Sequence, residues 1–170
     1  PTTSEVRLEL PGIPKRFQPV DKYKGSQIIH EYPAGDMGNI YLTEMQRSLK
    51  AALYSRVSDP ASFVSHLAEF YQYALNPRSF TSTNQSLYVN VVNSLLEARG
   101  YSPIKEQGIL DFVAVRVQPE AFGKYFADLV QESNPGIYSK KPAVVDKVKV
   151  GALSREVASK EADALSKAKT

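Results

Sequence analysis

The sequence contains no cysteine, and its only histidines, His30 and His66, lie far apart in the chain. The absence of cysteine excludes disulfide bonds, thiolate zinc sites and cysteine nucleophiles. Two separated histidines do not form a histidine-rich cluster, so we expect no metal site. A serine–histidine–acid triad would have to use one of these two residues.

Long hydrophobic runs and a strong net charge are also absent. No apolar run reaches the roughly 18 residues that a membrane-spanning helix needs, and residues 1–20 lack the apolar core of a signal peptide. The net charge is +3 and most basic residues are dispersed, which does not indicate nucleic-acid binding. We therefore predict a soluble protein with no membrane or nucleic-acid partner. These absences leave its location open between the cytoplasm and delivery as a secreted effector.

The composition that remains is that of one globular domain, with 170 residues of which 42% are hydrophobic and 23% charged. Apolar residues at three- and four-residue spacing predict helices over 39–55 and 60–75. Asp59 is the expected cap of the second helix, and Pro60 suits its first position because no amide is needed there. The expected buried stripe of that helix is Phe63, Leu67, Phe70, Tyr71 and Ala74.

Further helices are expected after residue 83. The helix over 84–99 should end at Gly100, and its apolar content predicts that it is the central helix. Another amphipathic helix is expected from Pro119 through Val130. The segment 108–117 is ambiguous: its β-branched residues favour a strand and its place between helices favours a helix, which we prefer.

The N-terminal region has a different pattern. VRLEL (6–10) alternates like a short strand, and the glycine turn followed by a β-branched pair predicts a hairpin or flap over 18–33. The expected fold class is mainly α, a helical bundle with a small N-terminal β-hairpin flap. The expected divisions are an extended segment over 1–17, a domain over 18–150 and a charged C-terminal helix or tail over 151–170.

Small polar residues occupy the loop directly before the helix at 84–99. A helix N-terminus presents unpaired amides and a partial positive charge, so it binds phosphate readily. The alternative is an ordinary capped loop, in which Ser82, Thr83 or Asn84 satisfies those amides. The candidate phosphate- or nucleotide-binding residues are Thr81, Ser82, Thr83, Asn84 and Ser86.

Residues 76–104, NPRSFTSTNQSLYVNVVNSLLEARGYSPI, resemble the core of the Fic/Doc family. The family signature, HPFxxGNGRxxR, opens a helix that often ends in Gly-Tyr-x-Pro. With Asn84 on the signature asparagine, Phe80 falls on the phenylalanine and Gly100 at the usual downstream distance. The likeness covers roughly residues 20–130. It implies a helical bundle with a flap over the active site, and transfer of AMP or another phosphate-containing group from a nucleotide to a target-protein hydroxyl.

The departures from the signature concern its chemistry. Arg78 occupies the position of the catalytic histidine, or Asn76 does if the proline is matched instead. Neither side chain is a general base near neutral pH. Ser82 stands where the family holds magnesium with an acidic residue. The two glycines and two arginines are replaced by Thr83, Gln85, Ser86 and Val89. We therefore expect no standard AMP transfer and no cofactor, although an ATP-like nucleotide is the ligand that the loop would take.

The resemblance also implies that the flap contacts a protein target, through Gln27, Ile28, Ile29 and His30. We expect His30 to be solvated. His66, in an apolar helix, is expected to be a hydrogen-bonded core residue; the alternative is that it reaches the loop and acts as a substitute base.

Three functions stay open at this point. The first is a degenerate Fic-like domain, a pseudoenzyme that acts as a protein-binding module of the effector or toxin kind. The second is a rewired transferase in which Arg78 and the 81–86 loop hold a phosphate group. The third is an unrelated helical adaptor.

Overall fold

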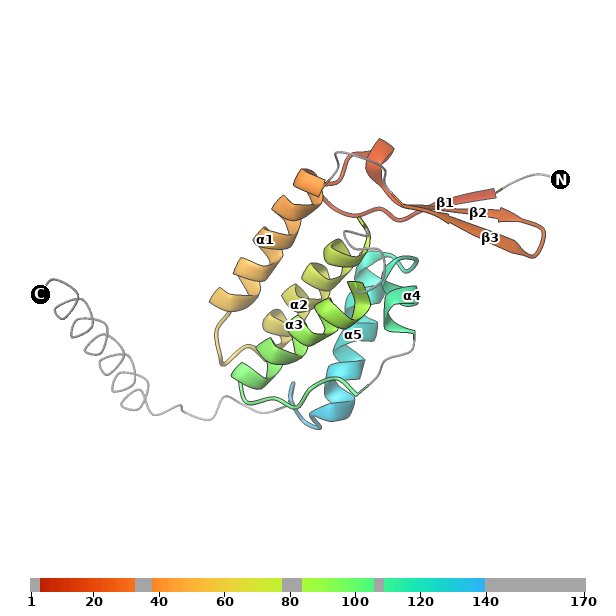
Figure 1. Cartoon of the computed structure of the whole chain (residues 1–170). Helices are drawn as coiled ribbons and strands as arrows, with labels where there is room; N and C mark the ends of the chain where they lie inside the picture. Colours follow the sequence, from red (N-terminus) through yellow and green to blue (C-terminus); the bar gives the residue numbers. More distant parts are fainter. Residues whose placement is uncertain (1–3, 33–37, 78–83, 106–108, 140–170) are drawn as a thin grey trace, which may run out of the picture. The chain divides into compact units, whose positions relative to one another are not determined.

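The computed structural model describes residues 4–32, 38–77, 84–105 and 109–139 (Figure 1). The chain divides into two units, 1–139 and 140–170, and the second lies outside the described residues. The described part is mainly helical with a small N-terminal sheet, as predicted. Its elements are β1 (Ser4–Arg7), the 3-10 helix η1 (Lys15–Phe17), β2 (Val20–Lys24), β3 (Gln27–Glu31), α1 (Gly38–Tyr54), α2 (Pro60–Leu75), α3 (Asn84–Ala98), α4 (Leu110–Ala114) and α5 (Pro119–Ser133).

The three strands form an antiparallel sheet in the order β1-β2-β3, which we call the flap. Lys24 pairs with Gln27, so the hairpin turn is two residues long, and Gly25 takes the left-handed conformation with φ of 59°. The predicted hairpin over 18–33 is confirmed. The strand predicted over 6–10 lies earlier, at Ser4–Arg7, and Leu8 and Leu10 belong instead to a buried cluster with Ile13, Tyr41 and Tyr73.

α2 is the central helix, and it packs against α1, α3, α4 and α5 (Figure 1). Its predicted start is confirmed, since the Asp59 carboxylate accepts a hydrogen bond of 3.1 Å from the Ser62 amide. The prediction that the helix over 84–99 is central is wrong. In α3 only one stripe, including Val92 and Leu96, is buried and Leu87 is exposed, whereas α2 is apolar on several faces. The predicted stripe of α2 is fully buried: Phe63, Leu67, Phe70, Tyr71 and Ala74.

The helix ends follow local rules. Gly100 has φ of 81°, the left-handed stop expected after α3. The segment 108–117 contains the short helix α4, as preferred over a strand. Arg99, at the end of α3, donates to the carbonyls of Ala52, Leu53 and Ser55 at 3.0–3.1 Å and so satisfies the C-terminus of α1.

Two tyrosines fasten the base of the flap to the helices. The Tyr41 hydroxyl donates to the Phe17 carbonyl at 2.8 Å, and the Tyr73 hydroxyl donates to the Pro11 carbonyl at 2.5 Å. Both rings belong to the cluster of Leu8, Leu10 and Ile13. Burial raises the pKa of Tyr41, and it raises the pKa of Tyr73 to about 12.

We predict that alkaline pH unfolds this protein through its buried tyrosines. Burial also raises the pKa of Tyr138 to about 12, and its hydroxyl donates to Ala127. An unfolded tyrosine ionises near pH 10, so the stabilisation is complete below about pH 10 and is lost as the pH rises toward 12. Thermal unfolding across this range should show a falling Tm. The Tm of the double variant Tyr73→Phe/Tyr138→Phe should fall less steeply with pH than the Tm of the wild type. Equal slopes in the two proteins would contradict the prediction.

Candidate functional site

The flap is held to the helical part by the side chain of Gln118, directly before α5. Its amide nitrogen donates to the Arg7 carbonyl at 2.9 Å, and its amide oxygen accepts from the Glu9 amide at 3.0 Å. The Gln118 side chain thus bonds to the backbone at the end of β1 as a neighbouring strand would, because it satisfies one carbonyl, that of Arg7, and one amide, that of Glu9. The position of β1 relative to α5 is thereby fixed.

A second attachment is the carboxylate of Asp21 on β2, which is shared by the side chains of His30 and Arg116. Asp21 Oδ1 lies 2.5 Å from His30 Nδ1, and Asp21 Oδ2 lies 3.4 Å from Arg116 Nε. The side chains of Asp21 and His30 are 5% and 7% exposed. Arg116 lies between α4 and α5, so this buried carboxylate connects two strands of the flap to the helical part.

His30 is therefore not solvated, contrary to expectation. Its cross-strand partner is Asp21, so the two side chains lie on the same face of the sheet. That face is turned toward Arg116. Strand alternation alone shows that His30 and Ile28 share a face, but it does not show that this face meets another element.

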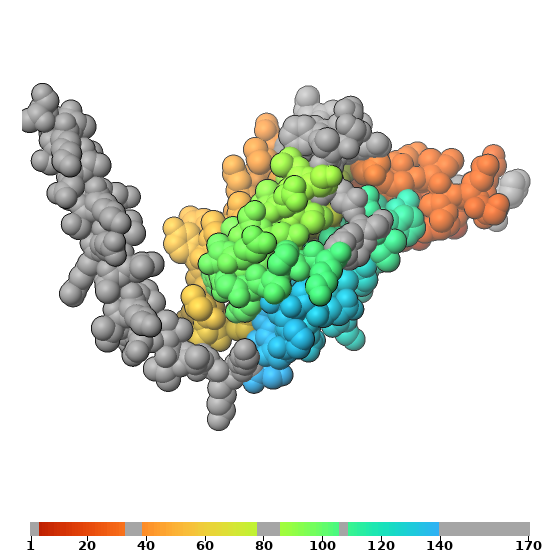
Figure 2. Space-filling model, turned by 60° about the horizontal axis from the view of Figure 1, so that its bottom comes forward, coloured from red at the N-terminus to blue at the C-terminus, as the bar shows by residue number. Residues whose placement is uncertain are grey.

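Arg116 also connects the flap to α4. Its guanidinium lies 3.9 Å from the centre of the Phe112 ring, a cation–π contact. α4 lies beside the flap in Figure 1, and Figure 2 shows the surfaces of α4 and the flap from another side. The side chains of Ile109 and Phe112 are more than half exposed there. The flap also exposes apolar side chains, since Ile28 is 49% and Ile29 50% exposed.

The predicted phosphate loop is only partly described. Arg78, Thr81, Ser82 and Thr83 lie outside the described residues. Asn84 begins α3, and Ser86 is exposed in its first turn. The phosphate-binding site at this loop stays a prediction.

Asn76, the other residue at the histidine position of the signature, is fully buried at the end of α2. Its amide nitrogen donates to the carbonyls of Gln72 at 2.7 Å and Ala114 at 3.3 Å. Gln72 donates to the same Ala114 carbonyl, at 3.1 Å. Asn76 thus joins α2 to α4, and it presents no proton-accepting group to solvent.

His66 was expected in the core, but its side chain is 31% exposed and pairs with Glu69 at 3.3 Å. The reason is its angular position on α2, on the side of Glu69 rather than on the buried stripe. With a rise of about 1.5 Å per residue, His66 lies roughly 13 Å along the helix axis from Leu75, the last residue of α2. Its alternative role as a substitute base stays a prediction, because residues 78–83 of the loop lie outside the described residues.

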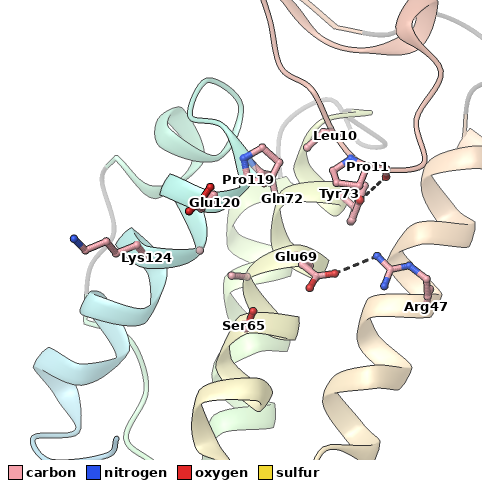
Figure 3. Close-up of a pocket in the computed structure, with 12 residues that line it drawn as sticks. Leu10, Pro11, Arg47, Ser65, Glu69, Gln72, Tyr73, Pro119, Glu120 and Lys124 are labelled. Atoms are coloured by element: carbon pink, nitrogen blue, oxygen red, sulfur yellow. Dashed lines mark hydrogen bonds and ion pairs between the residues drawn. The ribbon is translucent and has the colours of Figure 1, made fainter.

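A cavity of about 470 Å³ lies over α2, between α1, α5 and the segment at Leu10 and Pro11 (Figure 3). Arg47 spans its side toward α1, donating to Glu44 at 2.7 Å and to Glu69 at 3.1 Å. The Lys124 side chain, on α5, points away from α2. The charged side chains of α1 and α2 at this cavity are therefore paired with one another. No residue that the sequence singled out for a site lines it.

Two features are absent from residues 4–32, 38–77, 84–105 and 109–139. Among these residues there is no group of three or more histidine and acidic side chains that could hold a metal ion. None of the helices that the structure describes has the length and hydropathy needed to cross a membrane.

The sequence did not indicate the residues that attach the flap to the helices. Asp21 is one acidic residue in a strand of alternating character, and a charge in such a strand usually faces water. Its partner Arg116 follows it by ninety-five positions, as the numbering shows, and no periodicity links the two. Gln118 carries only the signal of preceding Pro119 at a helix start.

Replacement of Asp21 by asparagine should lower the free energy of unfolding by about 3 kcal/mol, because removing one member of a buried ion pair leaves its partner charge without compensation. Urea denaturation measures this difference. Glu5→Gln is the matched control, since Glu5 pairs with Arg7 at 3.7 Å on the exposed surface of the same sheet. The control should change stability by about 0–1 kcal/mol. Equal losses of unfolding free energy in the two variants would show that Asp21 contributes no more stability than an exposed ion pair.

Comparison with protein-family models, with curated proteins and with solved structures gives no match for this chain. The likeness to the Fic/Doc family therefore stays a prediction from the residues that carry it.

Proposed function

We propose that this chain is a protein-binding module, a degenerate Fic-like domain without standard AMP transfer, whose flap holds an extended segment of a target protein along β3. The observation that carries the proposal is the free outer edge of β3, with apolar side chains exposed on both faces of the strand. Within the described part of the chain, β3 pairs with β2 alone. Extended segments add to such edges through backbone hydrogen bonds.

The register identifies the backbone groups that would receive this segment. In a hairpin with a two-residue turn, the residues flanking the turn exchange hydrogen bonds, and every second pair along the strands does the same. Gln27, Ile29 and Glu31 thus bond to β2. The amides and carbonyls of Ile28 and His30 point to the outer edge, where a partner strand would bond.

The composition of β3 supports a binding role for this edge. Exposed edge strands usually carry lysine, proline or a bulge, which prevent unwanted pairing. β3, QIIHE, has no lysine and no proline, and it pairs with β2 in continuous register. Ile28 and Ile29 are each about half exposed. The one acidic residue of β3, Glu31, is at its end and pairs with Lys22. The exposed side chains in the middle of the strand are therefore apolar, as suits a partner-binding edge.

The attachments of the flap support the same role, because a preorganised edge binds at a lower entropic cost. Asp21 and Gln118 attach the sheet to the helical part, and Tyr73 holds the segment that follows β1. The rewired transferase stays a prediction, since Arg78 lies outside the described residues.

The test uses the full chain as bait for random peptides displayed on phage. Ile28→Pro removes the outward amide of β3 while leaving its ladder with β2 intact. We expect enriched peptides to bind the Ile28→Pro variant about tenfold more weakly. One backbone hydrogen bond to the peptide is lost, and the alignment of the peptide along β3 is disturbed. Ile28→Val, which keeps the amide, should bind like the wild type. No enrichment by the wild type, or equal affinity for Ile28→Pro, would overturn the proposed function.

A further inference from the structure

The outward backbone groups of β3 restrict how an identical strand could pair with it. The amides and carbonyls of Ile28 and His30 point outward, whereas the residues between and beside them bond to β2. In an antiparallel pair, two residues that face each other are either both hydrogen-bonded or both not. An even-numbered residue of β3 therefore faces an even-numbered residue of a second β3, and an odd-numbered residue faces an odd-numbered one.

The length of the strand selects one register from those that remain. β3 runs from Gln27 to Glu31. Only a register centred on Ile29 lets every residue of the strand face a residue of the other strand; centring on Ile28 places the hairpin turn opposite the strand end. In the register centred on Ile29, Ile28 exchanges two hydrogen bonds with His30 of the second copy. Two-fold symmetry repeats this pair on the other side of the axis.

The side chains that this register brings together are compatible. Ile29 meets its own counterpart at the two-fold axis, in a non-hydrogen-bonded pair, the kind in which side chains lie closest. Ile29 is 50% exposed in the single chain, so the contact removes apolar surface from water. Gln27 faces Glu31 of the second copy, where an amide can donate to a carboxylate. No residues of like charge face each other.

We propose that β3 pairs with β3 of a second copy of this chain, antiparallel and centred on Ile29, when no target segment covers the edge. The turn of the flap lies at the end away from the helices (Figure 1). The antiparallel arrangement therefore puts the two helical parts at opposite ends of a joined sheet of six strands.

This self-pairing regulates access to the edge of β3. It requires only the free edge, whereas its competition with a target rests on the proposed function, since both occupants bond to Ile28 and His30. The pairing strand has 5 residues, and a standard interface has about 20–30 residues a side. We therefore expect a weak dimer that dissociates rapidly, so that in dilute solution most chains are monomers with an open edge.

Disulfide trapping tests the register directly, because the chain has no cysteine of its own. In Ile29→Cys the two introduced residues meet at the axis with Cα atoms about 4.5 Å apart, a separation that a disulfide can span. Gln27→Cys is the matched control: it lies on the same face of β3 and is exposed, but its counterpart lies four positions along the strand, about 14 Å away.

Under mild oxidation we expect Ile29→Cys to form its intermolecular disulfide about tenfold faster than Gln27→Cys, because only the first pair lies within disulfide reach. A circular dichroism melt verifies that both variants are folded. Equal rates in the two variants overturn the inference.

A mixture of two variants tests the same register at a second point. Gln27→Cys of one copy faces Glu31→Cys of the other, so the mixed disulfide should form about tenfold faster than the disulfide of either variant with itself. Mass spectrometry distinguishes the three products. A mixture without an excess of the mixed disulfide overturns the inference.

The third arm needs no cysteine. Analytical ultracentrifugation of the wild type at rising concentration should show a dimer with a dissociation constant on the order of 0.1–1 mM. Ile28→Pro removes one outward amide from each copy and should weaken the dimer about tenfold, whereas Ile28→Val should dimerise like the wild type. A wild type that stays monomeric, or a dimer that Ile28→Pro leaves unchanged, overturns the inference.

The two proposals fail in different ways. Enriched peptides that are sensitive to Ile28→Pro, without faster trapping of Ile29→Cys than of its control, contradict the self-pairing alone. Specific trapping of Ile29→Cys without any enriched peptide contradicts the proposed function alone. Where both are found, a bound peptide should slow the trapping of Ile29→Cys, and an unchanged rate overturns the competition between target and second copy.

Discussion

The arrangement of this protein depends on one buried carboxylate. Asp21 carries its charge from a strand into the interior, where it meets His30 on the neighbouring strand and Arg116 between two helices. A buried charge is costly unless it is paired, so the three side chains stabilise one position of the flap against the helices. Because the flap has that position, β3 presents a fixed edge and α4 a fixed apolar surface beside it.

The helical part follows closely from local sequence rules. The cap at Asp59, the stop at Gly100 and the buried stripe of α2 each result from the properties of a few neighbouring residues. Such signals are local in the chain, so they can be recognised without a structure. The flap turn at Gly25 is likewise determined by neighbouring residues. The central place of α2 rather than α3 is not, because it depends on how the helices pack around one another.

The candidate site depends on contacts that are distant in sequence. His30 has the appearance of a surface residue in a strand, and only Arg116 from the far half of the chain makes its face an interior one. Likewise Asn76, singled out as a possible counterpart of a catalytic histidine, is a structural residue because Ala114 lies next to it. Charge pairing and burial of this kind leave no periodic pattern, so the sequence identified the flap but not what holds it.

The central claim is that β3 has a preorganised free edge, and amide hydrogen exchange observed by NMR tests it most directly. In the free chain, the amide of Ile29, which bonds to β2, should exchange slowly, and those of Ile28 and His30 should exchange much faster. Addition of a bound peptide should slow Ile28 and His30 selectively. Slow exchange at Ile28 and His30 in the free chain, or no change at these two amides on binding, would contradict the account.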